Sequence, residues 1–310
     1  MTDAPVVARG LVKRYGDLVA VDSVDLTVEH GDVFGYLGPN GAGKTTSLRM
    51  LLGLIRPSEG RVQLFGRDPL VDGATALDGV AGFVEGPAFY PYLSARRNLE
   101  LLADYDDGPR SRIDEVLELV ELRDRAGDRV GGYSHGMKQR LGIAASLLRA
   151  PRLLLLDEPT TGLDPAGMRD MRELVRRLAA EGITILLSSH LLYEVEELCN
   201  RVAIVRRGRI VYEGLLSELK AGAATGYRLR VVDVETARRV AASIAGVGDV
   251  VASDGEVRFT AGDDAAAMLT IALGRAGVGF TALVPRTATL EELFLDLTEG
   301  ERPPLVQEVA

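Results

Sequence analysis

The sequence has a single cysteine, Cys199, and this scarcity excludes two kinds of cross-link. One thiol cannot form an internal disulfide, and it cannot supply the thiolates of a structural zinc site. Cys199 stands in the apolar register of a predicted helix, and a free cysteine in such a place packs like a small hydrophobic residue. We therefore expect Cys199 to belong to the core.

Long apolar runs and excess positive charge are also lacking. No segment approaches the ~20 apolar residues of a membrane-spanning helix, and residues 1–10 show no basic stretch followed by an apolar core. We expect the chain itself to stay out of the bilayer. The formal net charge is −9, so the broad basic surface of nucleic-acid-binding proteins is missing and no nucleic-acid partner is expected.

What is present is the composition of a folded globular protein, with 46% hydrophobic and 26% charged residues. Short apolar runs at 153–156 and 183–187 are typical of strands buried on both faces of a parallel sheet, and helical periodicity lies between them at 166–180. This β, α, β order indicates an α/β core. Further predicted elements are antiparallel strands at 7–14 and 19–29, a strand at 32–37 and a helix at 45–54.

A segment of small residues at 220–225 predicts a linker, and a second pattern of elements begins beyond it. Strands and helices follow in the order β, α, β, β, α, β, with a turn at Asp254-Gly255, which predicts a small α+β, ferredoxin-like domain. The expected elements are a strand at 227–233, a helix at 235–245, a strand at 249–253, a strand directly after the turn, a helix at 263–276 and a strand at 280–284, with a last helix at 290–297. The chain is thus divided into a first domain at 1–220, an accessory or regulatory domain at 226–300 and a tail at 301–310.

Residues 38–45, Gly-Pro-Asn-Gly-Ala-Gly-Lys-Thr, match the phosphate-binding pattern G-x-x-x-x-G-K-[ST] between a predicted strand and a predicted helix. The glycines let backbone N–H groups point at phosphate oxygens, and the helix adds its positive N-terminal end. We expect Lys44 to neutralise the β and γ phosphates of ATP and the Thr45 hydroxyl to hold Mg²⁺. The predicted nucleotide-binding residues of this loop are Gly38, Pro39, Asn40, Gly41, Ala42, Gly43, Lys44, Thr45 and Thr46.

Two adjacent carboxylates, Asp157 and Glu158, follow the buried strand at 153–156, at the edge of an α/β sheet where ligands collect. Asp157 is expected to act on the Mg²⁺ shell. Glu158 is expected to polarise the attacking water as a general base. By themselves two acidic residues after a strand also fit a surface turn, and it is the phosphate-binding loop that favours a catalytic pair.

Residues 133–140, Tyr-Ser-His-Gly-Met-Lys-Gln-Arg, precede a predicted helix rich in Ala, Ile and Leu. They resemble the signature motif of ABC ATPases, usually Leu-Ser-Gly-Gly-Gln, and Asp157 follows Ser134 at about the distance typical of that family. Ser134 fits a helix N-cap, and its hydroxyl together with the Gly136 N–H can clamp a γ-phosphate. His135 and Met137 depart from the motif and leave Ser134 and Gly136 intact.

Other segments match the same family in order. Tyr15 resembles the aromatic residue that stacks on adenine, although an isolated tyrosine there would fit a half-buried strand position. Residues 160–164 resemble the loop that communicates across the nucleotide dimer, and the resemblance makes Asp164 a nucleotide-binding residue. His190, after the buried strand at 183–187, resembles the switch histidine that contacts the γ-phosphate and is predicted to be catalytic with Lys44 and Glu158. His30 falls in an expected exposed hairpin and receives no role.

One departure concerns Glu85, which stands where the family usually has a glutamine in the loop that reaches Mg²⁺ and the membrane subunit. A carboxylate can also coordinate Mg²⁺, but it adds negative charge and cannot donate an amide hydrogen bond. The resemblance therefore makes Glu85 a metal ligand together with Thr45 and Asp157, the alternative being a solvated loop carboxylate. The segment at 85–94, Glu-Gly-Pro-Ala-Phe-Tyr-Pro-Tyr-Leu-Ser, resembles the bacitracin-resistance and lantibiotic-immunity branch of ABC exporters.

The resemblance spans about residues 6–219 and implies the P-loop ABC ATPase fold, a mixed sheet core with antiparallel β and α-helical subdomains. It implies ATP and Mg²⁺ as cofactors and ATP hydrolysis in a head-to-tail homodimer. It also implies export of an antibiotic-like or amphipathic compound through a separate polytopic membrane permease, with the chain at the cytoplasmic face of the cell membrane. For the C-terminal domain it implies an auxiliary role, and a purely stabilising role remains open.

Three alternatives remain. A soluble ABC ATPase that is not coupled to transport would be expected to carry a second cassette or a long coiled coil, and neither is seen in the sequence. A small-molecule sensor with a degenerate ATPase conflicts with the presence of Lys44, Glu158 and His190. A P-loop kinase leaves the motif around Ser134 without an explanation.

Overall fold

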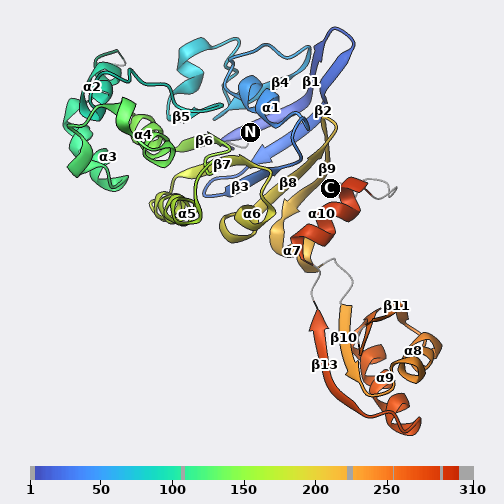
Figure 1. Ribbon diagram of the computed structural model, residues 1–310. Helices are drawn as coiled ribbons and strands as arrows, with labels where there is room; N and C mark the ends of the chain where they lie inside the picture. Colours follow the sequence, from blue (N-terminus) through green and yellow to red (C-terminus); the bar gives the residue numbers. More distant parts are fainter. Residues whose placement is uncertain (1–3, 106–108, 222–225, 254, 287–288, 300–310) are drawn as a thin grey trace. The chain divides into compact units, whose positions relative to one another are not determined.

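The computed structural model describes residues 4–105, 109–221, 226–253, 255–286 and 289–299 (Figure 1). The chain divides into two compact units, of which the first ends at Leu216 and the second begins at Ser217. The linker was expected a few residues later, and most of it, residues 222–225, lies outside the described residues. The same holds for Asp254 of the expected turn and for the tail at 301–310.

The first unit is built on a six-stranded sheet with the order β5-β6-β7-β3-β8-β9. All neighbours are parallel except β8 and β9, which pair antiparallel. Every residue of β6 and β7 is buried, as the continuous apolar runs predicted. The strands are β3 (Val33–Leu37), β5 (Val80–Phe83), β6 (Leu153–Asp157), β7 (Thr184–Ser189), β8 (Arg201–Arg206) and β9 (Arg209–Leu215).

A second, antiparallel sheet has the order β2-β1-β4, with β1 at Val6–Tyr15, β2 at Leu18–Val28 and β4 at Glu59–Leu64. Helix α1 (Lys44–Leu51) contacts β1, β2 and β4 as well as β6, so it packs between the two sheets (Figure 1). The buried side chains of these elements form one hydrophobic cluster. Because this cluster holds α1 from both sides, the loop before α1 has a fixed place at the edge of the six-stranded sheet.

The remaining helices of the first unit form two groups. Helices α5 (Pro165–Ala180) and α6 (Leu192–Leu198) cover the sheet face opposite α1, and α2 (Ala95–Tyr105), α3 (Ile113–Leu119) and α4 (His135–Leu147) pack on one another (Figure 1). This is the mixed sheet with antiparallel and helical subdomains that the ABC resemblance implies. Short 3₁₀ turns lie at η1 (Gly73–Leu77), η2 (Arg110–Arg112), η3 (Arg123–Arg125) and η4 (Val130–Gly132). Across the described ranges, no helix combines the length and apolarity needed to cross a membrane.

Two expectations about helix ends need correction. Helix α1 stops at Leu51 instead of Leu54, because Gly53 takes a left-handed conformation and the Leu54 N–H donates to the Arg49 carbonyl in a Schellman motif. Cys199 is buried as expected, but it follows α6 and does not lie within it. Burial raises the pKa of the Cys199 thiol far above its ordinary value.

The second unit has its own four-stranded antiparallel sheet with the order β11-β12-β10-β13. Alternate side chains of β10 and β12 pack against α8 and α9 in a separate core, as in the stacked pair of Tyr227 and Phe259. The order β, α, β, β, α, β is the one expected from the sequence. The elements are α7 (Leu216–Ala221), β10 (Gly226–Val231), α8 (Val234–Ser243), β11 (Val247–Ser253), β12 (Glu256–Ala261), α9 (Asp263–Arg275), β13 (Phe280–Arg286) and α10 (Leu290–Glu299).

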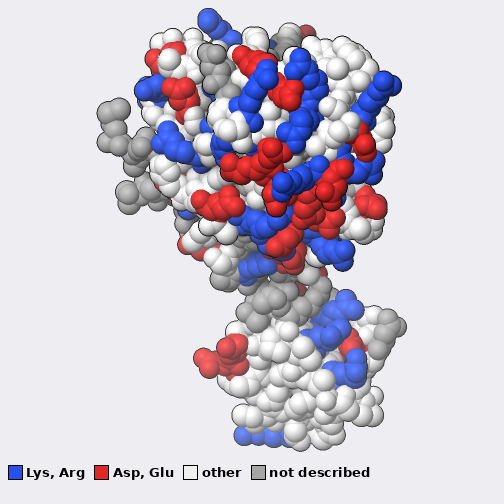
Figure 2. Space-filling model, turned by 90° about the vertical axis from the view of Figure 1, so that its left-hand side faces the viewer, with Lys and Arg blue, Asp and Glu red and all other residues white. Residues whose placement is uncertain are grey.

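Charges of both signs interleave on the side of the first unit shown in Figure 2. Helices α2 and α3 carry exposed ion pairs, among them Arg96–Asp114, Arg97–Glu100 and Arg123–Glu118. Exposed pairs of this kind each stabilise a fold only slightly, because water screens them. Among the described residues, acidic and basic side chains therefore alternate on this face.

Candidate nucleotide site

The loop at 38–43 joins β3 to α1, and two of its glycines are required by close backbone contacts. A Cβ atom at Gly38 would lie 2.6 Å from the Val205 carbonyl oxygen, and one at Gly43 would lie 2.4 Å from the Ala20 carbonyl oxygen. Gly43 also has φ of 102°, which disfavours other residues. It is the N-cap of α1 and has no side chain to cap the helix, so the first N–H groups of α1 remain available for an anion.

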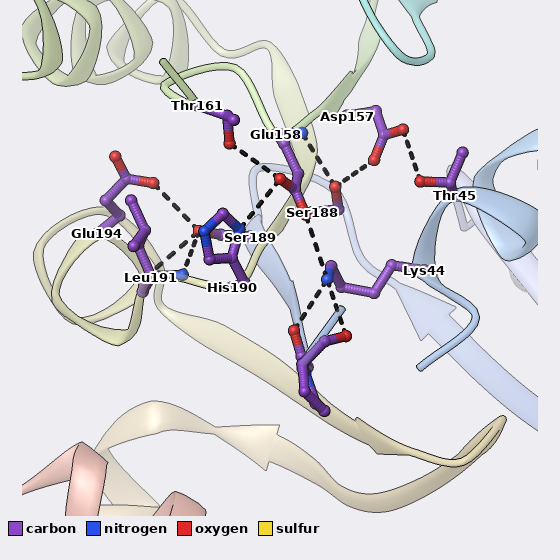
Figure 3. Close-up of polar contacts among 12 residues, drawn as sticks. Lys44, Thr45, Asp157, Glu158, Thr161, Ser188, Ser189, His190, Leu191 and Glu194 are labelled. Carbon is purple, nitrogen blue, oxygen red and sulfur yellow. Dashed lines mark hydrogen bonds and ion pairs between the residues drawn. The ribbon is translucent and has the colours of Figure 1, made fainter. Parts of the chain in front are cut away.

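Lys44, the first residue of α1, is buried, and its ammonium group faces the loop. Its Nζ atom donates to the Gly38 carbonyl at 2.8 Å and to the Pro39 carbonyl at 3.3 Å (Figure 3). The same atom lies 3.2 Å from Glu158 Oε1. The lysine of the loop and the second carboxylate after β6 are therefore paired directly.

Asp157 is the last residue of β6, and its carboxylate accepts hydrogen bonds from three donors. The Thr45 hydroxyl donates to Oδ2 at 2.9 Å, and the Ser188 hydroxyl donates to Oδ1 (Figure 3). The Glu85 backbone N–H also donates to Oδ2, at 3.3 Å. Thr45 and Asp157, both predicted metal ligands, thus lie side by side. Since only 4% of Asp157 is exposed, these bonds fix its carboxylate in one orientation.

Glu158 has φ of 48°, a conformation that turns its side chain out of the strand direction. Oε2 accepts from the Thr161 hydroxyl at 2.9 Å and lies 3.0 Å from His190 Nδ1 (Figure 3). Burial by itself raises the pKa of the Glu158 carboxyl, but the Thr161 hydroxyl, Lys44 and His190 outweigh it and leave the pKa below its ordinary value. The carboxyl is therefore ionised at neutral pH and can accept a proton.

His190 follows β7 in a loop that is tied down by side chains. The Ser189 hydroxyl donates to Glu194 Oε2 at 3.1 Å and accepts from the Leu191 N–H at 2.9 Å. A carboxylate only accepts hydrogen bonds, so Nδ1 of His190 carries the proton in its contact with Glu158. The sequence prediction that His190 and Glu158 belong to one site agrees with this geometry.

A hollow of about 510 Å³ opens above the loop. Tyr15 stands in its wall with 46% of the residue exposed, and Lys13 Nζ lies 5.0 Å from the centroid of the Tyr15 ring. An exposed aromatic face beside a phosphate-binding loop suits a flat base. The wall consists of Tyr15, Leu18, Val19, Ala20, Asn40, Gly41, Gly43, Lys44, Thr45, Thr46, Glu158, Arg207 and Gly208.

Eight of the predicted site residues line this hollow, namely Tyr15, Asn40, Gly41, Gly43, Lys44, Thr45, Thr46 and Glu158. Gly38, Pro39, Asp157 and His190 are hydrogen-bonded to Lys44, Thr45 or Glu158, and Ala42 belongs to the same loop.

Four other predicted residues do not reach this group through their side chains. Ser134 and Gly136 lie at the start of α4, where Ser134 accepts from the Met137 N–H at 3.2 Å as the N-cap. Asp164 is the N-cap of α5 and accepts from the Gly167 N–H at 2.8 Å. The Glu85 side chain, 67% exposed, forms an ion pair with Arg49, and only its backbone N–H reaches Asp157.

Several contributors to the site have no role in the sequence prediction. Ser188 orients Asp157, Thr161 orients Glu158, and Arg207 lines the hollow from the turn between β8 and β9. The dipeptide Arg207-Gly208 between two strands was a turn signal that could have drawn attention to Arg207. Ser188 carries no such local signal, because its contact with Asp157 depends on pairing between β6 and β7. Thr161 falls in the segment at 160–164, which the ABC resemblance marks, but its contact with Glu158 was not predicted.

Comparison with known proteins places these features in one family. Residues 21–161 match the family model of ABC transporters. The chain is 47% identical over 212 residues to the bacitracin transport ATP-binding protein BcrA of Bacillus licheniformis, over 68% of this chain and 69% of that protein. It is 38% identical over 312 residues to the daunorubicin resistance ATP-binding protein DrrA3 of Streptomyces coeruleorubidus, over 97% of this chain and 98% of that protein.

Solved structures agree with this assignment. CbiO1 of Clostridium perfringens, part of an ABC transporter complex, is 26% identical with a TM-score of 0.65 over 78% of this chain and 96% of that chain. A dimeric ATP-binding cassette bound to ADP and Pi is 26% identical with a TM-score of 0.61 over 68% of this chain and 98% of that chain. Taken with the phosphate-binding loop and the Lys44–Glu158 pair, these likenesses show that the chain belongs to the ABC transporter family as a nucleotide-binding ATPase subunit.

Proposed function

We propose that this ATPase works as a head-to-tail homodimer at the cytoplasmic face of the cell membrane. There it powers export of an antibiotic-like or amphipathic compound through a separate polytopic permease. The observation that carries the catalytic part is the position of Glu158, whose ionised carboxylate contacts both Lys44 and His190. These contacts support a general base beside the phosphates, since a base must lie within hydrogen-bond reach of the proton it accepts.

In this mechanism the loop N–H groups and Lys44 hold the β and γ phosphates, and the Tyr15 ring stacks on the adenine. A water molecule attacks the γ-phosphorus, its proton passes to Glu158, and the bond to the ADP oxygen breaks. His190 keeps Glu158 in place through Nδ1–H and is proposed to contact the γ-phosphate through its other ring nitrogen. Positioning and electrostatics do most of the work in phosphoryl transfer, so this placement is the main contribution of the protein.

Thr45 and Asp157 are the proposed Mg²⁺ ligands. Their oxygens lie 2.9 Å apart, and both are hard donors of the kind that Mg²⁺ prefers. Mg²⁺ keeps several waters and needs only one or two carboxylates beside the nucleotide phosphates, so this donor pair fits the ion. When bound, the ion would neutralise charge on the β and γ phosphates. The sequence predicts Glu85 as a third ligand, but its carboxylate forms an ion pair with Arg49, so we propose that Glu85 affects the charge around the ion and does not coordinate it.

The homodimer is proposed because the predicted nucleotide-binding residues fall into two separate sets. Ser134, Gly136 and Asp164 lie outside the hollow that Lys44 and Glu158 share. Ser134 and His135 are exposed at the N-terminal end of α4, and such an end attracts anions. A partner copy turned head to tail would bring these groups to the γ-phosphate, and the dimeric ADP-bound relative supports this arrangement.

Export and its cargo are inferred from relatives. The names of the two relatives concern bacitracin transport and daunorubicin resistance, and the segment at 85–94 resembles the same branch. We expect ATP turnover to rise when the chain is reconstituted in vesicles with its permease and an amphipathic antibiotic. If turnover is the same with and without the permease, the alternative of an ATPase not coupled to transport is favoured.

The catalytic proposal is tested with Glu158→Gln, which removes the base and preserves the shape of the side chain. We expect hydrolysis to slow by roughly 10²–10⁴-fold while ATP affinity is retained. ATP with Mg²⁺ should then convert the variant from monomer to stable dimer in size-exclusion chromatography. Lys44→Ala is the control, because it should lose nucleotide binding and dimerisation together. A Glu158→Gln protein with the normal rate of turnover would remove Glu158 from the mechanism.

A further inference from the structure

His135 occupies a signature position at which the family usually has glycine, and its ring reaches a neighbouring loop. Nε2 of His135 lies 3.0 Å from the Thr161 carbonyl oxygen. Because a carbonyl oxygen only accepts, Nε2 carries the proton and donates it to this bond. The contact is close, since a Cβ atom at Gly162 would lie 3.4 Å from His135 Cδ2. The start of α4 is thus attached to the loop that follows Glu158.

Thr161 continues the connection to the proposed base. Its backbone N–H donates to the Glu158 carbonyl at 3.1 Å, and its hydroxyl donates to Glu158 Oε2 at 2.9 Å. Thr161 is therefore bound by His135 on one side and by Glu158 on the other. Glu158 has an uncommon positive φ, and such a conformation persists only where its surroundings hold it. The direction of the Glu158 carboxylate depends on this short chain of bonds.

A second acceptor lies close to the same ring. Gln139, one helical turn along α4, is 3% exposed, and its Nε2 atom lies 3.5 Å from His135 Nε2. Within the described residues, its Oε1 atom is buried and has no hydrogen-bond partner. A buried acceptor without a partner is costly, and rotation of the amide would present it to the imidazole. His135 therefore has two candidate acceptors, the Thr161 carbonyl and Gln139.

We propose that His135 is a positioning residue that links Ser134 of the signature to Glu158 through Thr161. Ser134 faces the partner's nucleotide in the proposed dimer, while Glu158 acts on the nucleotide of its own protomer. Engagement of Ser134 would then favour one of the two acceptors of His135 and set the direction of Glu158. With glycine at this position no side chain could make the bond. The inference rests on the dimer and on the role of Glu158 proposed above.

The test compares His135→Leu with His135→Gln. Both residues are good helix formers of similar size, but only glutamine keeps an N–H donor at a distance from Cβ comparable to Nε2. We expect His135→Leu to lower kcat on the order of five-fold with KM for ATP little changed, because one directing hydrogen bond is lost. His135→Gln should restore most of kcat. Thermal unfolding of both variants checks that the fold is intact.

Thr161→Val removes the second connection, the hydrogen bond from the Thr161 hydroxyl to Glu158. Combined with His135→Leu it should cost little more than either change alone, because both act through the same chain. The proposal would be overturned if the fold losses of kcat in the two single variants multiplied in the double variant. It would also be overturned if His135→Leu and His135→Gln lowered kcat equally. A raised KM with unchanged kcat would also overturn it, because His135 would then touch the partner's nucleotide directly.

Glu158→Gln separates this inference from the function on which it rests. If Glu158→Gln turns ATP over normally, the assignment of the base fails whatever the His135 variants do. If Glu158→Gln is inactive and His135→Leu matches the unchanged protein in both kcat and KM, only the link fails. The imidazole can be observed directly, because the chain has three histidines and nitrogen NMR of labelled histidine resolves so few rings. Loss of a proton from Nε2 of His135 in the neutral ring would contradict the bond to Thr161.

Discussion

Asp157 and Glu158 are neighbours in the chain, yet their surroundings give them different chemistry. Asp157 is buried and accepts three hydrogen bonds, from Thr45, Ser188 and the Glu85 N–H, so its oxygens are held in one orientation. Glu158 is turned toward Lys44 and His190 at the edge of the hollow. Glu158 also differs from Asp157 in its backbone, which has a positive φ. Two adjacent carboxylates can therefore serve a metal and a water separately.

Substitution of Glu85 can show whether a negative charge at this position affects ATP binding. The backbone N–H of Glu85 is bound to Asp157, so the residue stands beside the proposed Mg²⁺ site, while its exposed carboxylate forms an ion pair with Arg49. We expect Glu85→Gln to bind metal-free ATP a few-fold more tightly, because one negative charge near the phosphates is removed. ATP titrations with Mg²⁺ and with a chelator measure the difference.

Arg49→Gln is the matched variant for this prediction. It leaves Glu85 charged and removes the cation, so its ATP affinity should depend more steeply on Mg²⁺ than that of the unchanged protein. The exposed pair itself contributes little to stability, which keeps the fold comparable in the two variants. Overlapping curves for all three proteins in both conditions would show that Glu85 is a solvated loop carboxylate.

At the scale of secondary structure, the segments that could be predicted are those whose signal is local. The strand, glycine loop and helix at 33–51 are contiguous, and β6 and β7 are continuous apolar runs, so the loop and the two carboxylates were found together. Strand β5 has four residues and a glycine, and it was not predicted. Its pairing with β6, like the contact of His135 with Thr161, joins residues far apart in the chain, and no local periodicity encodes such pairing.

Gly82 in β5 shows how tightly that pairing is built. Its φ is 150°, and a Cβ atom there would lie 1.9 Å from the Leu155 carbonyl oxygen of β6. We expect Gly82→Ala to lower the free energy of unfolding of the first unit by roughly 3 kcal/mol or more, because strain and overlap with rigid backbone add together. Urea titration followed by circular dichroism measures this change.

Gly66→Ala provides the control for the backbone conformation. Gly66 has φ of 79°, and a Cβ atom there would meet nothing within 4 Å. Gly66→Ala should lower the free energy of unfolding by only about 1 kcal/mol, the strain of a left-handed backbone conformation. Equal losses at the two positions would mean that the contact between β5 and β6 relaxes easily and that Gly82 is not required by it.

At the scale of the whole molecule, each of the two units has a hydrophobic cluster of its own among the described residues. One cluster joins β1, β2, β3, α1 and their neighbours, and the other joins β10, β12, α8 and α9. Every residue that lines the hollow belongs to the first unit. A ligand stabilises the part of a protein that forms its binding site. Nucleotide binding should therefore raise the unfolding temperature of the first unit and leave that of the second unit unchanged.

We expect Glu158→Gln to unfold in two calorimetric transitions, of which only the one from the first unit responds to ATP and Mg²⁺. At a nucleotide concentration about 100 times the dissociation constant, that transition should rise by roughly 5–10 °C, the shift that ~2.7 kcal/mol produces in a unit of this size. The other transition should stay in place, because the described residues that line the hollow all belong to the first unit. Adding Lys44→Ala should abolish the shift. A single transition that moves as a whole would show that the two cores unfold together.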